Sequence, residues 1–180
     1  MEVKVPKACE VACYKRLKKG EKEAFIRAVD DDYRVHWMVD NLPVGMFNTK
    51  NKKEASFSRG FPVGFHTGVG RNNAKHFLYN HIRIIIQYHD DYKEENLNGE
   101  ESTTKIVGFR VEPMSIKHTW EGEAFKEGQT VLTTCNAMTP PSNDPNNFLS
   151  LDKAVDSIVF TYDVFWEKSD VEWSQRYEII

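Results

Sequence analysis

The sequence lacks a long uninterrupted run of apolar residues. A helix that spans a membrane needs about 20 consecutive, mostly apolar residues, whereas the most apolar stretch of this chain, HIRIIIQYH at 81–89, carries Arg83 within it. The N-terminal sequence MEVKVPKACEVACYKRL has no continuous apolar segment after its early lysine, so no signal peptide is visible. We therefore expect that the chain as given does not enter a membrane.

The chain also lacks an excess of basic residues. It contains 24 Lys and Arg against 27 Asp and Glu, which gives a net charge of −3. A nucleic-acid backbone is bound mainly by clustered Lys and Arg that release counterions. The basic cluster at 15–22 is interrupted and is followed by acidic residues at 30–32, a pattern typical of a solvated face. We expect no nucleic-acid partner.

Motifs for phosphate binding and nucleophilic catalysis are missing as well. The glycine-rich stretch GFPVGFHTGVG at 60–70 is not followed by the Lys-Ser/Thr pair of a P-loop or by a helix-forming run. No Gly-x-Ser-x-Gly motif is present, and Cys135 has no histidine near it in sequence. The tripeptide Pro-Val-Gly, at 43–45 and 62–64, instead predicts two chain reversals or bulges, because proline fixes φ and glycine accepts a positive φ. We expect no catalytic and no cofactor-binding residue.

The histidines offer a metal-binding alternative. His81 and His89 share a face of one predicted strand but lie eight residues, about 26 Å, apart, which is too far for one ion. His81 and His118 come from different predicted strands, and the alternation places His81 outward and His118 inward. We therefore expect no metal site, and a metal-dependent hydrolase that uses His81 and His118 is the third of our functional hypotheses.

What the sequence does contain is the composition of an ordinary folded protein and a strong alternation of apolar and polar residues. Hydrophobic residues make up 40% of the chain and aromatic residues 12%. At about 20–32, Ala24, Phe25, Ala28 and Val29 fall at helical spacing, so the pattern predicts one short amphipathic helix. From about residue 33 onward the alternation is typical of half-buried strands. One helix and many strands without a βαβ rhythm predict a mainly β fold, an antiparallel β-sandwich.

The alternation also assigns individual strands, faces and loops. Predicted strands cover 33–39, 77–89, 104–112, 114–120, 130–135 and 157–167, and predicted loops cover about 45–60, 89–104 and 136–148. In the second of these strands Leu78, Ile82, Ile84, Ile86 and Tyr88 face inward, whereas Tyr79, His81, Arg83, Gln87 and His89 face outward. Both faces of the last predicted strand are partly apolar, which indicates a central position in its sheet.

Aromatic residues gather near the end of the sequence. Trp166, Trp173 and Tyr177 accompany Arg176 in the string FWEKSDVEWSQRYE. Such a group is typical either of an interfacial belt beside a membrane or of packing at an edge strand. Composition alone leaves both interpretations open.

Five strings of the chain carry a resemblance to a known family. They are YRVHWMVDNLPVG, GFPVGF, HIRIIIQYH, IVGFRVEPMSIKH and FTYDVFWEKSDVEWSQRYE. In order and spacing they resemble the non-cytosolic N-terminal domain of the transmembrane-nine superfamily, also called nonaspanins or endomembrane protein 70-like proteins, from about residue 13 to 177. The family usually has Trp-Asp where this chain has Tyr177-Glu178. It also begins with a signal peptide and continues into membrane helices. We therefore expect 1–180 to be a single lumenal domain, truncated before the membrane-spanning region, as an excised domain or a partial gene product.

The resemblance implies a non-enzymatic function. Nonaspanins are multispanning proteins of Golgi and endosomal membranes that are linked to sorting and surface delivery of membrane cargo, and no catalytic residues are established for their lumenal domain. The implied partners are membrane cargo proteins and the protein's own transmembrane region. By the same resemblance, Trp166, Trp173, Arg176 and Tyr177 would lie close to the bilayer or the transmembrane bundle. The alternative from a different class is a β-sandwich that binds a small ligand such as a glycan or a lipid.

The three cysteines, Cys9, Cys13 and Cys135, allow three pairings and leave one thiol free in each. The lumenal compartment that the resemblance implies is oxidising, which favours one disulfide. A Cys9–Cys13 bond spans too great a distance in an extended strand and is feasible only in a turn. A Cys13–Cys135 bond would close a long loop and would stabilise the fold by about 4–5 kcal/mol in the chain-entropy model. The sequence does not choose between these two pairs.

Overall fold

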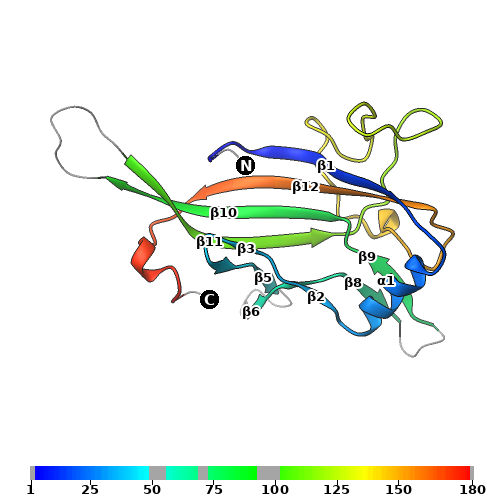
Figure 1. Ribbon diagram of the computed structural model, residues 1–180, viewed down its shortest axis with the longest axis horizontal. Coiled ribbons are helices and arrows are strands. Elements are labelled where there is room, and N and C mark those ends of the chain that lie inside the picture. The colour runs from blue at the N-terminus through cyan, green and yellow to red at the C-terminus, as the bar shows by residue number, and fades with distance from the viewer. Residues whose placement is uncertain (1–2, 49–55, 69–72, 93–101, 179–180) are drawn as a thin grey trace.

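A six-stranded mixed sheet is the largest element of the computed structural model, which describes residues 3–48, 56–68, 73–92 and 102–178 (Figure 1). Its strands are β1 (Lys7–Arg16), β5 (Gly45–Asn48), β6 (Ser56–Arg59), β10 (His81–Tyr92), β11 (Ser102–Met114) and β12 (Ser157–Lys168). Their order across the sheet is β1-β12-β10-β11-β5-β6. The pairs β1–β12, β10–β11 and β5–β6 are antiparallel, whereas β10–β12 and β11–β5 are parallel.

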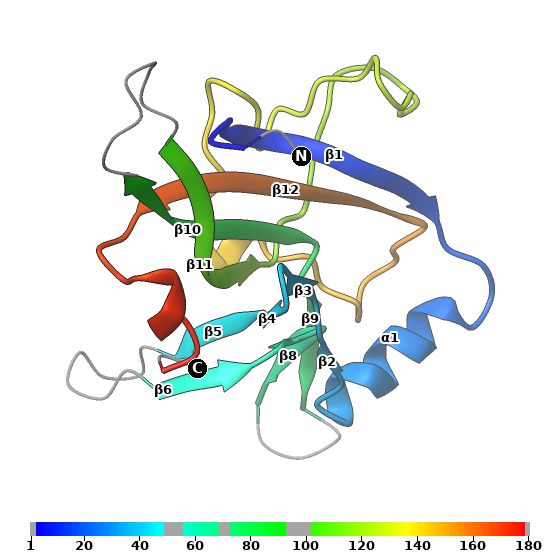
Figure 2. The ribbon, with the colours of Figure 1, turned by 60° about the vertical axis from the view of Figure 1, so that its left-hand side comes forward.

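Smaller elements cover one face of this sheet. They are α1 (Glu21–Asp30) and the strands β2 (Arg34–Val35), β3 (Met38–Val39), β4 (Leu42–Pro43), β7 (Phe61–Pro62), β8 (Gly64–Thr67) and β9 (Lys75–Leu78). The strands pair as β2–β7, β3–β4 and β8–β9. In Figure 2 these small strands and α1 lie below β1, β12, β10 and β11, at the level of β5 and β6. The main core cluster joins the two layers, because Ile82, Ile86 and Val164 of the large sheet pack with Leu42 and Phe61. The prediction of a mainly β fold with one short helix is confirmed, although the large sheet is mixed rather than wholly antiparallel.

Helix α1 occupies most of the predicted range 20–32. Its N-cap residue, Gly20, has φ 87° and supplies no side-chain cap. The carboxylate of Glu21 accepts a hydrogen bond from the Lys18 N–H at 2.7 Å instead and so caps the turn that precedes the helix. Phe25 and Val29 of the predicted apolar stripe turn toward the strands, and Val29 is 6% exposed.

Strand β1 precedes the helix, although the sequence predicts strands only from about residue 33 onward. Its alternation is hidden by two irregularities in its pairing with β12, between Lys7 and Glu10 and between Val11 and Cys13. At the first of these, Cys9 has a positive φ of 46°. Each bulge shifts the faces of the residues that follow it, so a two-residue period fails to reveal this edge strand.

The predicted strand over 77–89 is divided in two by Asn80. The Asn80 side chain is 2% exposed. Its amide donates to the carbonyls of Ile116 at 2.8 Å and Val159 at 2.9 Å, and its oxygen accepts from the Ile116 N–H at 2.8 Å. These side-chain hydrogen bonds take the place of the backbone hydrogen bonds that would continue the strand. They also tie β10 to β12 and to the segment that follows β11.

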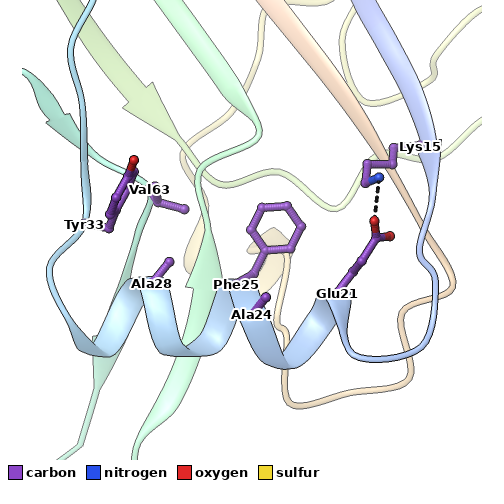
Figure 3. Close-up of a pocket in the computed structure, with 7 residues that line it drawn as sticks. All are labelled: Lys15, Glu21, Ala24, Phe25, Ala28, Tyr33 and Val63. Carbon is purple, nitrogen blue, oxygen red and sulfur yellow. Dashed lines mark hydrogen bonds and ion pairs between the residues drawn. The ribbon is translucent and has the colours of Figure 1, made fainter.

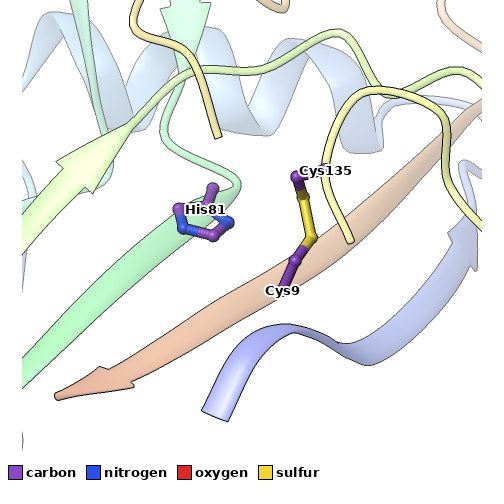
Figure 4. A group of neighbouring side chains, drawn as sticks. All are labelled: Cys9, His81 and Cys135. Carbon is purple, nitrogen blue, oxygen red and sulfur yellow. A yellow bond between two sulfur atoms is a disulfide. The ribbon is translucent and has the colours of Figure 1, made fainter. Parts of the chain in front are cut away.

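The outward placement of His81 in that predicted strand is wrong, since the side chain is 0% exposed. Ile85, which lies four residues further along, is also buried, at 4%. Both faces of β10 are covered here, because Ile82 and Ile86 on one face pack with Leu42 and Phe61, and the segment that carries Cys135 lies beside His81 on the other (Figure 4). The alternation rule assumes one solvated face, and that condition does not hold for β10.

The two Pro-Val-Gly tripeptides are kinks between short strands rather than turns with a positive φ. Each places its proline at the end of one strand and its glycine at the start of the next, β4 to β5 and β7 to β8. Neither Gly45 nor Gly64 has a positive φ. A side chain at Gly45 would collide with the ring of Phe57, and one at Gly64 would collide with the Phe77 carbonyl. Close packing, and not chain reversal, therefore requires glycine at both positions.

The remaining predictions of strands and loops are confirmed in part. The predicted loop 45–60 contains β5 and β6, which pair with each other, and only 49–55 lies outside the described residues. The predicted loop 89–104 is shorter, because β10 continues to Tyr92 and β11 begins at Ser102; 93–101 lies outside the described residues. The predicted loop 136–148 contains the 3-10 turn η1 (Pro145–Asn147) and no strand.

The predicted strands 114–120 and 130–135 are joined by the single bridge Trp120–Leu132. The predicted strand 33–39 divides into the two short strands β2 and β3.

No helix in the described part of the chain has the length and apolar character that crossing a membrane requires.

Candidate functional site

A cluster of aromatic and charged residues at the C-terminal end is the first candidate site. Its centre is Arg176, which is 4% exposed although it is charged. The Arg176 guanidinium carbon lies 4.2 Å from the ring centre of Trp173 and 5.0 Å from that of Tyr177. Trp173, which begins the short turn η2 (Trp173–Gln175), is 44% exposed and Tyr177 is 54% exposed. The buried cation therefore holds two aromatic side chains at the surface by cation–π contacts.

A tight hairpin supplies the partner of this cation. Asp40 and Asn41 connect β3 to β4 with φ values of 46° and 61°, as a two-residue type I′ turn requires. The carboxylate of Asp40 accepts a hydrogen bond from Arg176 Nη1 at 2.8 Å. Arg176 Nη2 also donates to the Tyr177 hydroxyl at 3.1 Å. The sequence signal for this hairpin was Asp-Asn between Val39 and Leu42, and sequence reasoning missed it.

Trp166, which the sequence groups with this cluster, makes other contacts. Its indole N–H donates to the Val5 carbonyl at 3.1 Å, and its ring lies 6.3 Å from that of Tyr88. It therefore fixes the N-terminal segment against β12. Of the four residues predicted to lie near a membrane, Trp173 and Tyr177 are exposed, whereas Arg176 is buried beneath them.

An open apolar hollow beside helix α1 is the second candidate site (Figure 3). It has a volume of about 290 Å³ and is lined by Lys15, Glu21, Ala24, Phe25, Ala28, Tyr33 and Val63. The helix stripe forms its floor, and Tyr33 and Val63 form one wall. A backbone hydrogen bond of 3.0 Å from Val63 to Tyr33 holds that wall in place.

Charge is confined to one end of this hollow. There the Lys15 ammonium lies 3.0 Å from the Glu21 carboxylate. Because the two charges compensate each other, the hollow presents mainly carbon to a ligand. Sugars are held by hydrogen-bonding groups placed around them, whereas an acyl chain needs only apolar surface. The lining therefore suits a lipid chain better than a glycan.

A buried cluster of histidine and threonine side chains is the third candidate site. His81 and His118 converge on one hydroxyl, with His81 Nδ1 at 2.8 Å and His118 Nε2 at 2.9 Å from Thr161 Oγ1. The second nitrogen of His118 lies 2.8 Å from the Thr134 hydroxyl. A hydroxyl has one proton to donate, so at least one of the two imidazoles donates its own N–H to Thr161.

The burial of this cluster decides its electrostatics and its chemistry. Burial, with a smaller contribution from the neighbouring His81, lowers the pKa of His118 to about 4, so this imidazole is neutral near pH 7. Both His118 nitrogens are occupied by hydroxyls, and His118 is 9% exposed. A hydrolytic metal that used both His81 and His118 would have to replace hydroxyl groups that now bond to the imidazole nitrogens. The third functional hypothesis therefore has little support.

A second histidine group, which sequence reasoning missed, joins α1 to β9. His76 Nε2 lies 2.9 Å from Asp30, and its Nδ1 lies 3.1 Å from Asp152. Burial opposes a charge on His76, but the hydrogen bonds and charges of Asp152 and Asp30 outweigh it and raise the His76 pKa. The carboxylates lie 46 and 76 positions away in sequence, so no local pattern revealed them.

The disulfide joins Cys9 to Cys135, with Cα atoms 5.8 Å apart, and leaves Cys13 exposed and free. Both pairs retained from the sequence, Cys9–Cys13 and Cys13–Cys135, are therefore wrong. The bulge at Cys9 turns its side chain to the face that Cys135 approaches, whereas Cys13 is exposed on β1. The bond connects the edge strand β1 to the segment after β11 across 126 residues.

The fold and these sites define a class of protein, a mainly β domain that carries a rigid aromatic surface at one end. Comparison with known families identifies the family. The family described as Endomembrane protein 70 matches residues 1–180, and the chain belongs to this family.

Several relatives of this chain are named as members of the transmembrane 9 superfamily. "Transmembrane 9 superfamily member 10" of Arabidopsis thaliana is 31% identical over 174 residues, which cover 94% of this chain and 26% of that protein. "Transmembrane 9 superfamily member 4" of Homo sapiens is 29% identical and covers 96% of this chain and 27% of that protein. "Putative phagocytic receptor 1a" of Dictyostelium discoideum is 27% identical and covers 93% of this chain and 24% of that protein. The chain thus spans about a quarter of the length of these relatives. No solved structure matches it.

Proposed function

We propose that residues 1–180 form a single lumenal, non-enzymatic domain of a multispanning Golgi or endosomal membrane protein. In this role the domain contributes to recognition, sorting or surface delivery of membrane cargo. Membership of the endomembrane protein 70 family supports the membrane association. One relative bears the name of a putative phagocytic receptor, which supports a role in recognition.

The observation that carries this proposal is the aromatic surface formed by Trp173 and Tyr177. Trp and Tyr are enriched where proteins meet the membrane interface, since their rings are apolar and carry a polar group. Here the two rings are fixed from below by Arg176, which is itself anchored to the Asp40 hairpin. A fixed pair of rings loses little conformational entropy on contact. We assign to them the contact with the bilayer interface or with the protein's own transmembrane region.

The cellular test uses the longest gene product that contains this chain, with a membrane cargo protein whose surface level is measured by flow cytometry. The double substitution Trp173→Ser and Tyr177→Ser should lower the surface level of the cargo at equal expression of the protein. A matched control replaces Val131 and Met138, which are 69% and 95% exposed, by serine and should leave the cargo level unchanged. Equal cargo levels for both variants and the parent would contradict the proposal.

A direct test measures co-sedimentation of the chain with phosphatidylcholine vesicles that contain phosphatidylserine. If the rings enter the bilayer interface, the double variant should bind at least about fivefold more weakly, because each large apolar side chain contributes about 1.5–3 kcal/mol on full burial. If the parent does not bind vesicles but the cellular effect persists, the contact is with the protein's transmembrane region.

The hollow beside α1 favours a second candidate function, the binding of an apolar ligand. Its volume of about 290 Å³ lies at the lower end for ligand pockets, which suits a single short acyl chain. Addition of a lysophospholipid should raise the melting temperature of the parent but not of Ala28→Trp, whose indole would fill the hollow. Glu23→Trp, on the exposed face of the same helix, is the control and should respond like the parent. An equal response of Ala28→Trp would exclude this site.

A further inference from the structure

Three potential metal ligands meet at the disulfide. The sulfurs of Cys9 and Cys135 and a ring nitrogen of His81 all lie within 4.8 Å of one another. Figure 4 shows the His81 ring pointing toward the disulfide from the start of β10. Around a tetrahedral zinc ion, with bonds of about 2.3 Å to sulfur and about 2.0 Å to nitrogen, ligand atoms stand roughly 3.5–3.8 Å apart. The three groups therefore need only small movements to surround one ion.

The His81 side chain is oriented as a metal-binding histidine usually is. It is 0% exposed, and its Nδ1 lies 2.8 Å from the Thr161 hydroxyl. Its Nε2 is buried, lies 3.3 Å from Asp163 Oδ2 and makes no hydrogen bond within the described part of the chain. A metal-bound histidine characteristically has its second nitrogen held by a carboxylate or another fixed group. If Nε2 coordinates, the Thr161 hydroxyl holds Nδ1; if Nδ1 coordinates, the Asp163 carboxylate lies beside Nε2.

Contacts other than the disulfide keep the three groups in place. The Cys9 N–H donates to Asp163 Oδ1 at 2.7 Å, so Asp163 fixes the Cys9 backbone, and its other carboxylate oxygen lies 3.3 Å from His81 Nε2. Cys135 is 1% exposed and packs with Leu132 in a buried cluster. Opening the sulfur–sulfur bond therefore leaves two thiols and one imidazole facing the same point.

We propose that the Cys9–Cys135 disulfide and a zinc site are two alternative states of the same cross-link. A dithiol reductant transfers two electrons and two protons to the disulfide, becomes a disulfide itself and leaves the Cys9 and Cys135 thiols. One Zn²⁺ then displaces both thiol protons and is bound by the two thiolates and His81, with water as the fourth ligand. Thiolate and imidazole form a donor set that suits zinc. In both states β1 stays joined to the segment after β11.

This proposal is independent of the recognition role. The test uses the chain with Cys13→Ser, which removes the exposed thiol outside the site. The protein is reduced with a phosphine, freed of it without oxygen and titrated with Co²⁺, whose bonds to thiolate absorb visible and near-ultraviolet light. We expect one Co²⁺ per chain, displacement of Co²⁺ by Zn²⁺, and no such absorption for the oxidised protein. Absence of thiolate–cobalt absorption in the reduced protein would overturn the proposal.

Two histidine variants of this protein test the third ligand. His81→Gln should weaken Co²⁺ binding at least about tenfold, as loss of a group that ligates or orients a ligand does. His89→Gln, in the same strand β10 but outside the group, is the matched control and should bind Co²⁺ like the parent. Equal binding by His81→Gln and the parent would overturn the site.

If reduction unfolds the chain, circular dichroism measures whether metal binding restores the fold. In that case Zn²⁺ should restore the native spectrum of the Cys13→Ser protein, because binding to a folded site drives folding. Thiolate absorption without recovery of the native spectrum would show binding to an unfolded chain and would equally overturn the proposal.

Discussion

Acidification should destabilise the fold through His118. In the folded state burial holds its pKa at about 4, against 6.5 for the unfolded chain. The folded state therefore favours the neutral imidazole. Its contribution to stability is fully present above pH 6.5 and is lost as the pH falls from 6.5 toward 4.

The magnitude follows from the two pKa values. A difference of about 2.5 units corresponds to a maximum loss of roughly 3.5 kcal/mol at about 1.4 kcal/mol per unit. At about pH 5 the loss is about 2 kcal/mol, because part of the folded population is still neutral there. This is a large fraction of the 5–15 kcal/mol typical of a folded domain.

Guanidinium denaturation of the oxidised protein at about pH 7.5 and about pH 5 measures this loss. His118→Gln removes the titrating group, so its free energy of unfolding should fall by about 2 kcal/mol less than that of the parent over the same interval. Contributions from groups that do not contact His118, His76 included, are common to both proteins and cancel in the difference. An equal fall for the two proteins would refute the assignment of a neutral, buried His118.

Three further substitutions test the other contacts. His76→Gln should remove a contribution of opposite sign. The raised His76 pKa gives stability that is fully present below pH 6.5 and is lost at higher pH. In urea denaturation, the free energy of unfolding of the variant should therefore fall further below that of the parent at about pH 5.5 than at about pH 8.5. Arg176→Ala should lower the unfolding free energy by about 2 kcal/mol, because it removes the charge-assisted hydrogen bond to Asp40, and should raise the exposure of Trp173 to acrylamide quenching. Gly64→Ala should cost about 1–3 kcal/mol in the same denaturation assay, because its Cβ would meet the Phe77 carbonyl and lie 2.8 Å from Val29; an unchanged midpoint would contradict the packing role of this glycine.

The strands that sequence predicts best are those whose pattern of burial is decided by their own residues. In β11, Val107, Phe109 and Val111 are all buried as the alternation predicts. Strand β12 is apolar on both faces in part, and it does lie inside the sheet, between β1 and β10. In both cases the sequence of the strand alone indicates which of its side chains are buried.

Features that depend on distant partners escape local patterns. Asn80 ends a strand by bonding to Ile116 and Val159, and Cys9 reaches Cys135 through a bulge. His81 is buried because a segment from elsewhere in the chain covers its face. In each case tertiary contacts override the two-residue period. Cys9 and His81 are also ligands of the proposed metal site.

The C-terminal segment, which carries Trp173 and Tyr177, and helix α1, which lines the hollow, lie on opposite sides along the longest axis of the molecule (Figure 1). A domain that contacts a membrane through Trp173 and Tyr177 would therefore leave the hollow open to a ligand. Substitutions at well-separated sites without shared partners act additively. The Ala28→Trp substitution should thus block the lysophospholipid response and leave vesicle binding intact, and the double serine variant should do the reverse. Loss of both properties on either change would mean that the two ends are coupled through the sheet, and that recognition at one end depends on occupancy at the other.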